Sequence, residues 1–427
     1  RIALFDPKGE TAAMLKKLGI AYRPVDATSD LSRYSVLVIG KGALTLDGPA
    51  PDVTRVRDGL KVVVFEQTGE VLEKRFGFRI AEYGLRWVYK RVPDHPLLAG
   101  LAGEHLRNWR GDSTTLPPRL KYELAVHFDG PEVEWAGLPV SRGWRCGNRG
   151  NVASAVIEKP AAGDFLPILD GGYSLQYASL MEYREGDGMV LFCQTDVTGR
   201  TEADPAAEAL VANIVRYVAA WKPTPRRTVV YAGQKPGLQY LKAAGVSPTA
   251  YAGRLSADQV LVLGPGARRA VGEKAASVKR WVKGGGPVLA VGLTGKEASE
   301  LLPLEVKTTR AEHIAAWFEA FGVGSPLVGV SPADVHNRDP RTLPLVDDGA
   351  TPVGNGVLAF AEDFGVVFCQ LPPWKLDYSG EKMNVKRTFR RLAYAANRLL
   401  ANLGAAGATP LLASVSRPVG DGERRWL

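Results

Sequence analysis

Short apolar runs alternate with amphipathic stretches along most of the chain. Runs at residues 2–5, 35–39 and 61–65 are each followed by a turn and a polar or helical stretch, and a similar series begins at residue 228. The first helical stretch of each series ends in a glycine, Gly19 or Gly245, as a left-handed helix C-cap requires. Apolar runs of this length between helices predict a parallel sheet covered on both faces.

The pattern occurs twice in the same order. The matched pairs of segments are 1–20 with 228–246, 35–44 with 259–268, 61–78 with 287–304, 107–118 with 336–344, and 188–194 with 365–370. The offset is nearly constant through the first four pairs, since 260 minus 36 is 224, 294 minus 68 is 226 and 337 minus 108 is 229. We therefore interpret the chain as a tandem duplication.

The first copy is longer than the second. The offset falls to 369 minus 193, which is 176, so the first copy holds about fifty additional residues. They read as short alternating runs broken by Gly, Pro and Asn, which predicts a β-rich insert at about 119–180. The sequence thus predicts an α/β fold of two flavodoxin-like doubly wound sheets: residues 1–221 with the insert, a linker at 222–227, a second domain at 228–405, and a C-terminal tail at 406–427.

Ligands of doubly wound sheets bind beyond the carboxyl ends of the strands. This rule directs attention to four loops of the first copy, at 40–42, 66–69, 107–113 and 194–200. The glycines at 40–42 and at 264–266 complete neither a dinucleotide nor a Walker motif, and we interpret them as tight turns.

Composition excludes several classes of protein. The 427 residues are 45% hydrophobic and 23% charged, as in globular proteins. The net charge of +9 is spread among interleaved acidic and basic residues, which argues against a nucleic-acid partner, and no run of 18 apolar residues predicts a membrane span. The chain starts inside a strand and without Met, so we expect a segment of a longer polypeptide, whose compartment stays open.

The order of strands, the turn after the third apolar run and the closing FCQ strands resemble class I glutamine amidotransferase-like domains. Such domains also occur as non-catalytic modules of glycosidases, including the trimer-forming domain of family 42 β-galactosidases. Segments at 107–118, 144–160, 170–177 and 190–207 are similar to the C-terminal region of bacterial family 2-like glycoside hydrolases or β-galactosidases. The resemblance implies upstream catalytic domains of the same polypeptide as partners, a homo-oligomer, and, if the parent degrades polysaccharide, an extracellular or periplasmic location.

An active amidotransferase of this family needs a cysteine at the turn after its third strand and a histidine near the last one. The first copy has Glu66, Gln67 and Thr68 at that turn, and the second has Leu293 and Thr294. No His follows either closing strand. Both turns are degenerate, so glutaminase activity is not expected.

The remaining cysteines and the histidines give no catalytic or metal site. Cys193 and Cys369 lie in apolar runs and are expected to be buried, whereas Cys146 is flanked by cations but has no assignable histidine partner. The spacing of His and Cys fits no metal site, and His95 and His105 are expected to serve turns and helix ends. No cofactor is predicted.

Three groups of residues are candidates for binding a ligand or a protein partner. They are Arg107, Asn108, Trp109, Arg110 and Asp112 in the repeated loop; Trp144, Arg145, Asn148, Arg149 and Asp170, with Tyr173 and Tyr177, in the insert; and Trp374, Lys375 and Tyr378 after the last strand of the second copy. The first group joins an aromatic ring to planar donors and a carboxylate, which suits a saccharide. Because the second copy keeps Asn337, Arg338 and Asp339 but lacks the Trp, we favour a loop-fixing role.

Three functions stay open at this point. The chain could be a non-catalytic pair of domains serving assembly or active-site support in a carbohydrate-active enzyme, an independent saccharide-binding module, or a hydrolase that uses Glu66, Asp112 and Asp196. We favour the first, because the resemblance supports it and the nucleophile is missing.

Overall fold

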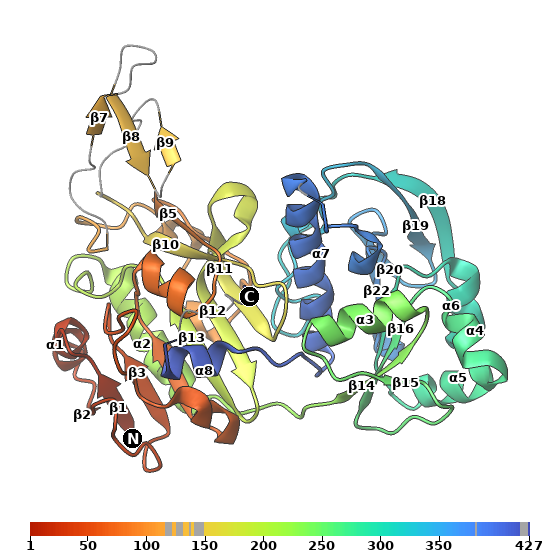
Figure 1. The fold of residues 1–427 in the computed structure, drawn as a ribbon, viewed down its shortest axis with the longest axis horizontal. Coiled ribbons are helices and arrows are strands. Elements are labelled where there is room, and N and C mark those ends of the chain that lie inside the picture. The colour runs from red at the N-terminus through yellow and green to blue at the C-terminus, as the bar shows by residue number, and fades with distance from the viewer. Residues whose placement is uncertain (116–121, 125–130, 136–137, 141–148, 381, 419–425) are drawn as a thin grey trace. The chain divides into compact units, whose positions relative to one another are not determined.

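The computed structural model describes residues 1–115, 122–124, 131–135, 138–140, 149–380, 382–418 and 426–427 (Figure 1). These residues form two compact units. The first comprises Arg1–Lys159, Leu166–Pro223 and Pro410–Leu427, and the second comprises Pro160–Phe165 and Thr224–Thr409. No helix in the described part of the chain combines the length and the hydrophobicity needed to cross a membrane.

The first unit is built on a sheet with the strand order β2-β1-β3-β4-β13-β12-β10-β5. The five strands that pair in parallel are β1 (Ile2–Phe5), β2 (Arg23–Pro24), β3 (Val36–Ile39), β4 (Lys61–Val64) and β13 (Gly188–Cys193). Numbered along the chain, they follow the order second, first, third, fourth, fifth, which is the flavodoxin-like order that the sequence predicts.

Antiparallel strands extend this sheet. They are β12 (Tyr177–Glu185), β10 (Ala153–Glu158) and β5 (Ile80–Leu85), while β11 (Phe165–Gly171) pairs with β12 and with β6 (Tyr89–Lys90). A separate small sheet joins β7 (Tyr122–Leu124), β8 (Pro131–Trp135) and β9 (Leu138–Val140). The β-rich part therefore begins at Ile80, earlier than the insert predicted at about 119–180.

Two α-helices flank the first sheet within its own part of the chain, α1 (Glu10–Lys17) and α2 (Pro205–Ala220). Between the strands lie a π-helical turn at Val71–Arg75 and 3-10 turns at Val53–Asp58, Pro96–Leu98 and Gly103–Leu106. Asp204 caps α2 by accepting a hydrogen bond from the Ala206 N–H, and Pro205 occupies the first helical position. Gly19 follows α1 with φ of 68°, as its predicted C-cap role requires.

The second unit repeats this arrangement. Its sheet has the order β15-β14-β16-β17-β22-β21-β20. The strands are β14 (Thr228–Ala232), β15 (Thr249–Ala250), β16 (Gln259–Leu263), β17 (Val288–Val291), β20 (Thr351–Val353), β21 (Leu358–Ala361) and β22 (Val366–Cys369), and a two-stranded ribbon pairs β18 (Lys307–His313) with β19 (Arg341–Asp348). The equal order and direction of the strands in the two sheets support the duplication.

Helices of the second unit lie on both faces of its sheet (Figure 1). They are α3 (Lys235–Ala243), α4 (Ala267–Val271), α5 (Ala275–Lys283), α6 (Gly295–Leu301) and α7 (Met383–Asn402). Two separate apolar clusters result. One packs α3 and α7 against the sheet, and the other packs α4, α5 and α6 against it. Burial on both faces is why strands such as β16 are continuously apolar.

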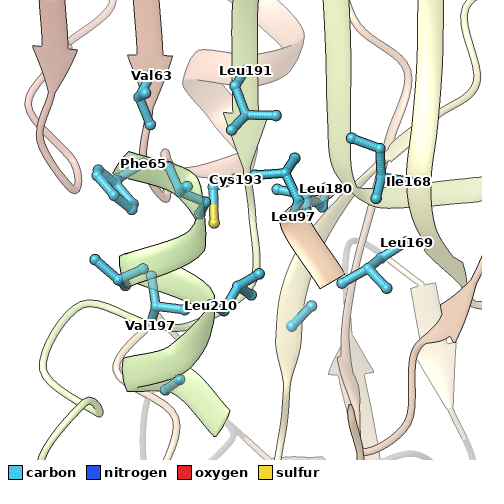
Figure 2. Packing of buried hydrophobic residues seen from close by; sticks show 14 of the residues in the cluster. Val63, Phe65, Leu97, Ile168, Leu169, Leu180, Leu191, Cys193, Val197 and Leu210 are labelled. Atoms are coloured by element: carbon cyan, nitrogen blue, oxygen red, sulfur yellow. The ribbon is translucent and has the colours of Figure 1, made fainter. Parts of the chain in front are cut away.

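An apolar cluster of the first unit lies beneath α2. Figure 2 shows Cys193 among Phe65, Leu191 and Leu210, side chains that come from the end of β4, from β13 and from α2. These side chains are almost completely buried. The cluster fixes the end of β13, from which the polar residues described below continue.

The chain's last segment packs in the first unit. In this segment α8 (Leu411–Ser416) lies against the 3-10 turn at Val53–Asp58, and the Ser416 hydroxyl accepts a hydrogen bond from the Val53 N–H at 2.9 Å. The buried Arg75 donates to the Val415 carbonyl at 2.9 Å. The sequence reads 406–427 as a tail; its apolar side chains instead complete the first unit, a long-range contact that local pattern does not reveal.

Candidate functional site: the carboxyl edges of the two sheets

Glu66 follows β4 directly and is buried at the carboxyl edge of the first sheet. Its two oxygens accept hydrogen bonds from Thr198, one from the N–H at 2.7 Å and one from the hydroxyl at 2.8 Å. Burial, and next the charge of Asp196, raise the pKa of Glu66 to about 7. A perturbed carboxyl at this edge is a candidate for acid–base chemistry, although both of its oxygens are already engaged.

Gln67 lies, with Glu66 and Thr68, at the turn where the sequence predicts a degenerate nucleophile position. Its backbone N–H donates to the Gln194 side-chain oxygen at 2.9 Å, and the Gln194 amide nitrogen donates back to the Gln67 carbonyl at 3.1 Å. The Gln67 side chain itself donates to the Gly40 carbonyl at 2.8 Å. Two glutamines thus occupy and close the turn.

Arg200 anchors the repeated loop at 107–113. This buried guanidinium donates to the carbonyls of Trp109 at 3.0 Å and Arg110 at 2.9 Å, and it pairs with Asp196 at 3.1 Å. Asp196 in turn accepts from the N–H of Thr114 at 2.8 Å. The loop is therefore held through its backbone by residues that follow β13.

Trp109 is only 1% exposed, so the expectation of an aromatic ligand platform at this residue is wrong. Its indole N–H donates to the His105 carbonyl at 2.8 Å, and the ring belongs to the core cluster. The side chains of the other candidates in this loop are exposed: Arg107, Asn108, Arg110 and Asp112. Asp112 bridges Arg149 through backbone atoms, and Arg107 lies over the exposed ring of Trp87 at 5.2 Å.

The insert candidates do not form one surface in the described part of the chain. Asp170 is fully buried and pairs with Arg91 at 2.6 Å and Lys159 at 3.4 Å, so its expected role as a surface ligand residue is corrected to an internal charge pair. Tyr173 is 72% exposed, whereas Tyr177 is half-buried. Trp144, Arg145 and Asn148 lie outside the described residues.

In the second unit, the turn after β17 leads into α6. Thr294 caps α6 and forms a capping box with Glu297, whose carboxylate accepts from the Thr294 hydroxyl at 3.0 Å. The other Glu297 oxygen accepts from the Gly266 N–H at 3.2 Å. Leu293, the other residue at this degenerate turn, is buried and carries no nucleophilic group. The Thr294 hydroxyl is used in the capping box.

A pocket of about 340 Å³ opens beside this turn. The polar side chains around it come from several elements: Thr294, Glu297, Arg310, Arg341, Thr342, Gln370 and Lys375. Gln370 is fully buried and donates to the Leu293 carbonyl at 2.9 Å and to the Pro344 carbonyl. Its side-chain oxygen has no hydrogen-bond partner among the described residues.

Of the three candidates after the last strand, only Lys375 lines this pocket. Trp374 is half-buried with its ring 5.5 Å from that of Tyr240, and Tyr378 stacks on Phe389 at 3.9 Å. Sequence reasoning missed Arg310, Arg341 and Gln370 as pocket residues, although the closing FCQ motif contains Gln370.

The described cysteines are buried, and His95 and His105 make hydrogen bonds to the backbone. Cys193 and Cys369 are fully buried, and burial raises the pKa of both thiols, that of Cys369 to about 11. His95 accepts a hydrogen bond from the Leu97 N–H at the start of a 3-10 turn, and His105 accepts one from the Ala102 N–H. Within the described residues no three His, Cys, Asp or Glu side chains are placed to bind a metal ion. Cys146 lies outside them.

Comparison with known proteins gives little further information. No protein-family model matches the chain, and no curated protein matches it significantly. Among the solved structures, the chain is similar to a GMP synthase component from Thermoplasma acidophilum, with 11% identity and a TM-score of 0.27. The match covers 51% of this chain and 94% of the other. A likeness this weak assigns neither a family nor an activity.

Proposed function

We propose that the chain is a pair of non-catalytic amidotransferase-like domains within a larger carbohydrate-active enzyme, where it serves assembly or supports a distant active site. The observation that carries this proposal is the state of the two turns that follow β4 and β17. Gln67 and Leu293 stand there, both buried, and neither side chain is a nucleophile.

The thiols nearest to these turns offer no substitute. Cys193 and Cys369 are inside the sheets, and the raised pKa of each keeps the sulfur protonated and unreactive. The first edge is also filled by its own side chains, because Glu66, Gln67 and Gln194 use their polar atoms on one another or on neighbouring loops. Such an edge suits a scaffold better than an enzyme.

The glycosidase parent rests on the resemblance of the segments around residues 107–118 and 190–207 to family 2-like glycoside hydrolases. On that basis, upstream catalytic domains of the same polypeptide and further copies of this chain are the proposed partners. The exposed Arg107, Arg110 and Asp112 on the loop that Arg200 anchors are suited to such a contact, because a rigid loop loses little conformational entropy on binding.

Light scattering after size-exclusion chromatography tests the assembly role. The chain is expected to self-associate or to bind the separately produced upstream portion, and Arg107→Ser with Arg110→Ser is expected to weaken that association, while the exposed pair Lys16→Ser with Lys17→Ser is not. If the chain stays monomeric and does not bind the upstream portion, the result contradicts the assembly role. The same preparation is expected to release neither ammonia from glutamine nor chromophore from aryl glycosides.

A hydrolase is the second candidate, because Glu66 has a pKa near 7 next to the carboxylate of Asp196. Against it, both carboxyls are buried and hydrogen-bonded, and Asp112 is exposed on another loop. Aryl-glycoside hydrolysis that disappears in Glu66→Gln but persists in Asp112→Asn would favour this candidate over the first.

A further inference from the structure

The pocket of the second unit has an excess of positive charge. Arg310 on β18, Arg341 at the start of β19 and Lys375 line it. None of their three side chains makes an ion pair or a hydrogen bond with other described residues. The carboxylate of Glu297, which also lines the pocket, is occupied by the capping box and the Gly266 N–H. Asp339 acts on Arg341 only through its charge. Three cations and one carboxylate thus line the cavity, and within the described residues none of the three cations forms an ion pair.

Gln370 adds a second, independent feature. Its counterpart in the first unit, Gln194, has its side-chain oxygen occupied by the Gln67 N–H, whereas the Gln370 oxygen is buried and unpartnered among the described residues. The Gln370 amide nitrogen donates to two carbonyls, which fixes the orientation of the amide and leaves the oxygen as the free acceptor. Buried acceptors normally have a partner, so this oxygen calls for a donor from a ligand.

Apolar side chains form a further part of the wall, beside Thr294 and Thr342. Leu343, Leu371, Pro372 and Leu376 line the pocket and are buried. A volume of about 340 Å³ lies at the lower end of the range for small-molecule pockets. The site also lies at the carboxyl end of the parallel strands, where doubly wound sheets bind their ligands.

We propose that this pocket binds a monosaccharide-sized molecule that carries one oxyanion and free hydroxyl groups. The oxyanion lies against Arg310, Arg341 and Lys375, one hydroxyl donates to the Gln370 side-chain oxygen, and the apolar wall contacts the carbon skeleton. Arginine forks bind carboxylate and phosphate equally well, so the ligand is a sugar acid or a sugar phosphate. This inference goes beyond the proposed assembly role and does not depend on it.

Isothermal titration calorimetry of the 427-residue chain tests the proposal with glucuronate, glucose 6-phosphate and the neutral methyl glucoside. Saturable binding of at least one of the anions is expected, weakened by salt, with the neutral sugar at least about tenfold weaker. The anion with the higher affinity shows whether the oxyanion of the ligand is a carboxylate or a phosphate. Cyclohexanecarboxylate, which has the charge without the hydroxyls, is expected to bind more weakly than glucuronate, because it cannot donate to Gln370.

Two variants locate the site. Arg310→Gln with Arg341→Gln is expected to weaken binding of the anion about tenfold or more, and Arg269→Gln, an exposed cation on α4 that does not line the pocket, is expected to leave it unchanged. If the double variant loses its circular dichroism spectrum, Lys375→Gln, at an exposed position, carries the test. No saturable binding of either anion up to about 10 mM, or equal affinity in the wild type and these variants, overturns the proposal. The light-scattering result is separate, so failure here leaves the assembly role standing.

Discussion

The glutamine after the last parallel strand is present in both units, and its side chain is used differently in each. Gln194 exchanges two hydrogen bonds with the backbone of Gln67, so the first edge is closed by a reciprocal pair. Gln370 donates a hydrogen bond to the Leu293 carbonyl, as Gln194 does to the Gln67 carbonyl, but its side-chain oxygen accepts none from the described residues. Gln370 also lines a pocket. The comparison teaches that duplicated positions can keep the same residue while its side chain is fully hydrogen-bonded in one copy and lines a cavity in the other.

Loops around the two edges differ in the same sense. At the first edge, Arg200 and Asp196 bind the loop at 107–114 over the strand ends. At the second edge, the corresponding stretch at 336–344 runs into β19, and Arg341 lines the pocket. Arg200, the cation at the first edge, is buried and forms an ion pair with Asp196. In the part of the chain that the structure describes, Arg310, Arg341 and Lys375 at the second edge form no ion pair.

Removing Arg200 gives the largest expected effect on this comparison. Arg200→Met leaves Asp196 and several loop carbonyls buried without their donor, which should cost about 3 to 5 kcal/mol of stability. Hydrogen exchange followed by mass spectrometry should show faster exchange in peptides from 107–115 and unchanged exchange in peptides from 288–301. The control Arg268→Met breaks an exposed pair with Glu300 and should cost less than about 1 kcal/mol. Equal costs would mean that the first edge is not held by Arg200.

Glu66 should make the first edge sensitive to pH. Its folded pKa of about 7 is raised above the ordinary 4.5, so this contribution to stability is complete below pH 4.5 and is lost as the pH rises through 7. Glu66→Gln, which cannot ionise, should therefore be more stable than the wild type at pH 8 by up to about 3 kcal/mol, and the gap should shrink towards pH 5.

Urea unfolding of both proteins at pH 5 and pH 8 measures this gap. Asp112→Asn is the control, because its exposed carboxyl should change stability by less than about 0.5 kcal/mol at either pH. A difference between wild type and Glu66→Gln that is the same at both pH values would show that Glu66 does not titrate in this range.

The two glutamines can be compared directly by replacing each with leucine. Gln194→Leu strands the Gln67 N–H in addition to two carbonyls, whereas Gln370→Leu strands only carbonyls. We expect Gln194→Leu to cost about 1 to 2 kcal/mol more, since an unsatisfied buried donor carries its own penalty. Denaturant midpoints of the two variants measure the difference. Equal midpoints would contradict the idea that only the first glutamine is fully used.

Threonines at the two turns should give the smallest effect. Thr294→Ala removes the cap of α6 and should cost about 1 kcal/mol, because its hydroxyl accepts from the Glu297 N–H. Thr68→Ala removes a contact of the same length, 3.3 Å, but at an exposed position and without a capping box, so it should cost less. Thermal unfolding of the two variants at the same pH ranks them, and the reverse order would mean that the capping box does not stabilise the second turn.

The sheet of each unit could be predicted from sequence because its strands are buried on both faces and therefore read as unbroken apolar runs. The duplication strengthens each prediction, because the same order of apolar runs occurs in both copies. β5 was not predicted, because Ile80–Leu85 mixes apolar, charged and glycine residues and is defined by its pairing with β10. Local composition says little about a strand that depends on such a partner.

Sites were harder to predict than strands. Trp109 has the composition of a ligand loop around it, yet its ring is in the core, and sequence carries no sign of which way a side chain in a loop points. Arg200 binds the Trp109 carbonyl, 91 positions away, and Gln370 binds the Leu293 carbonyl, 77 positions away. Only the folded chain brings such partners together. The burial of Cys193 and Cys369 was predicted correctly, because an apolar strand determines burial locally.

The return of residues 410–427 to the first unit has a consequence for synthesis on the ribosome. Arg75 and Val53 receive their partners Val415 and Ser416 only after the intervening residues 224–409 have been translated, which at ordinary elongation rates takes roughly 10 to 40 seconds. During that interval the nascent first unit carries an uncovered apolar patch, while the second unit can already fold. The second unit can therefore complete its folding before the first one does. A nascent chain stalled before residue 410 should be a substrate for chaperones.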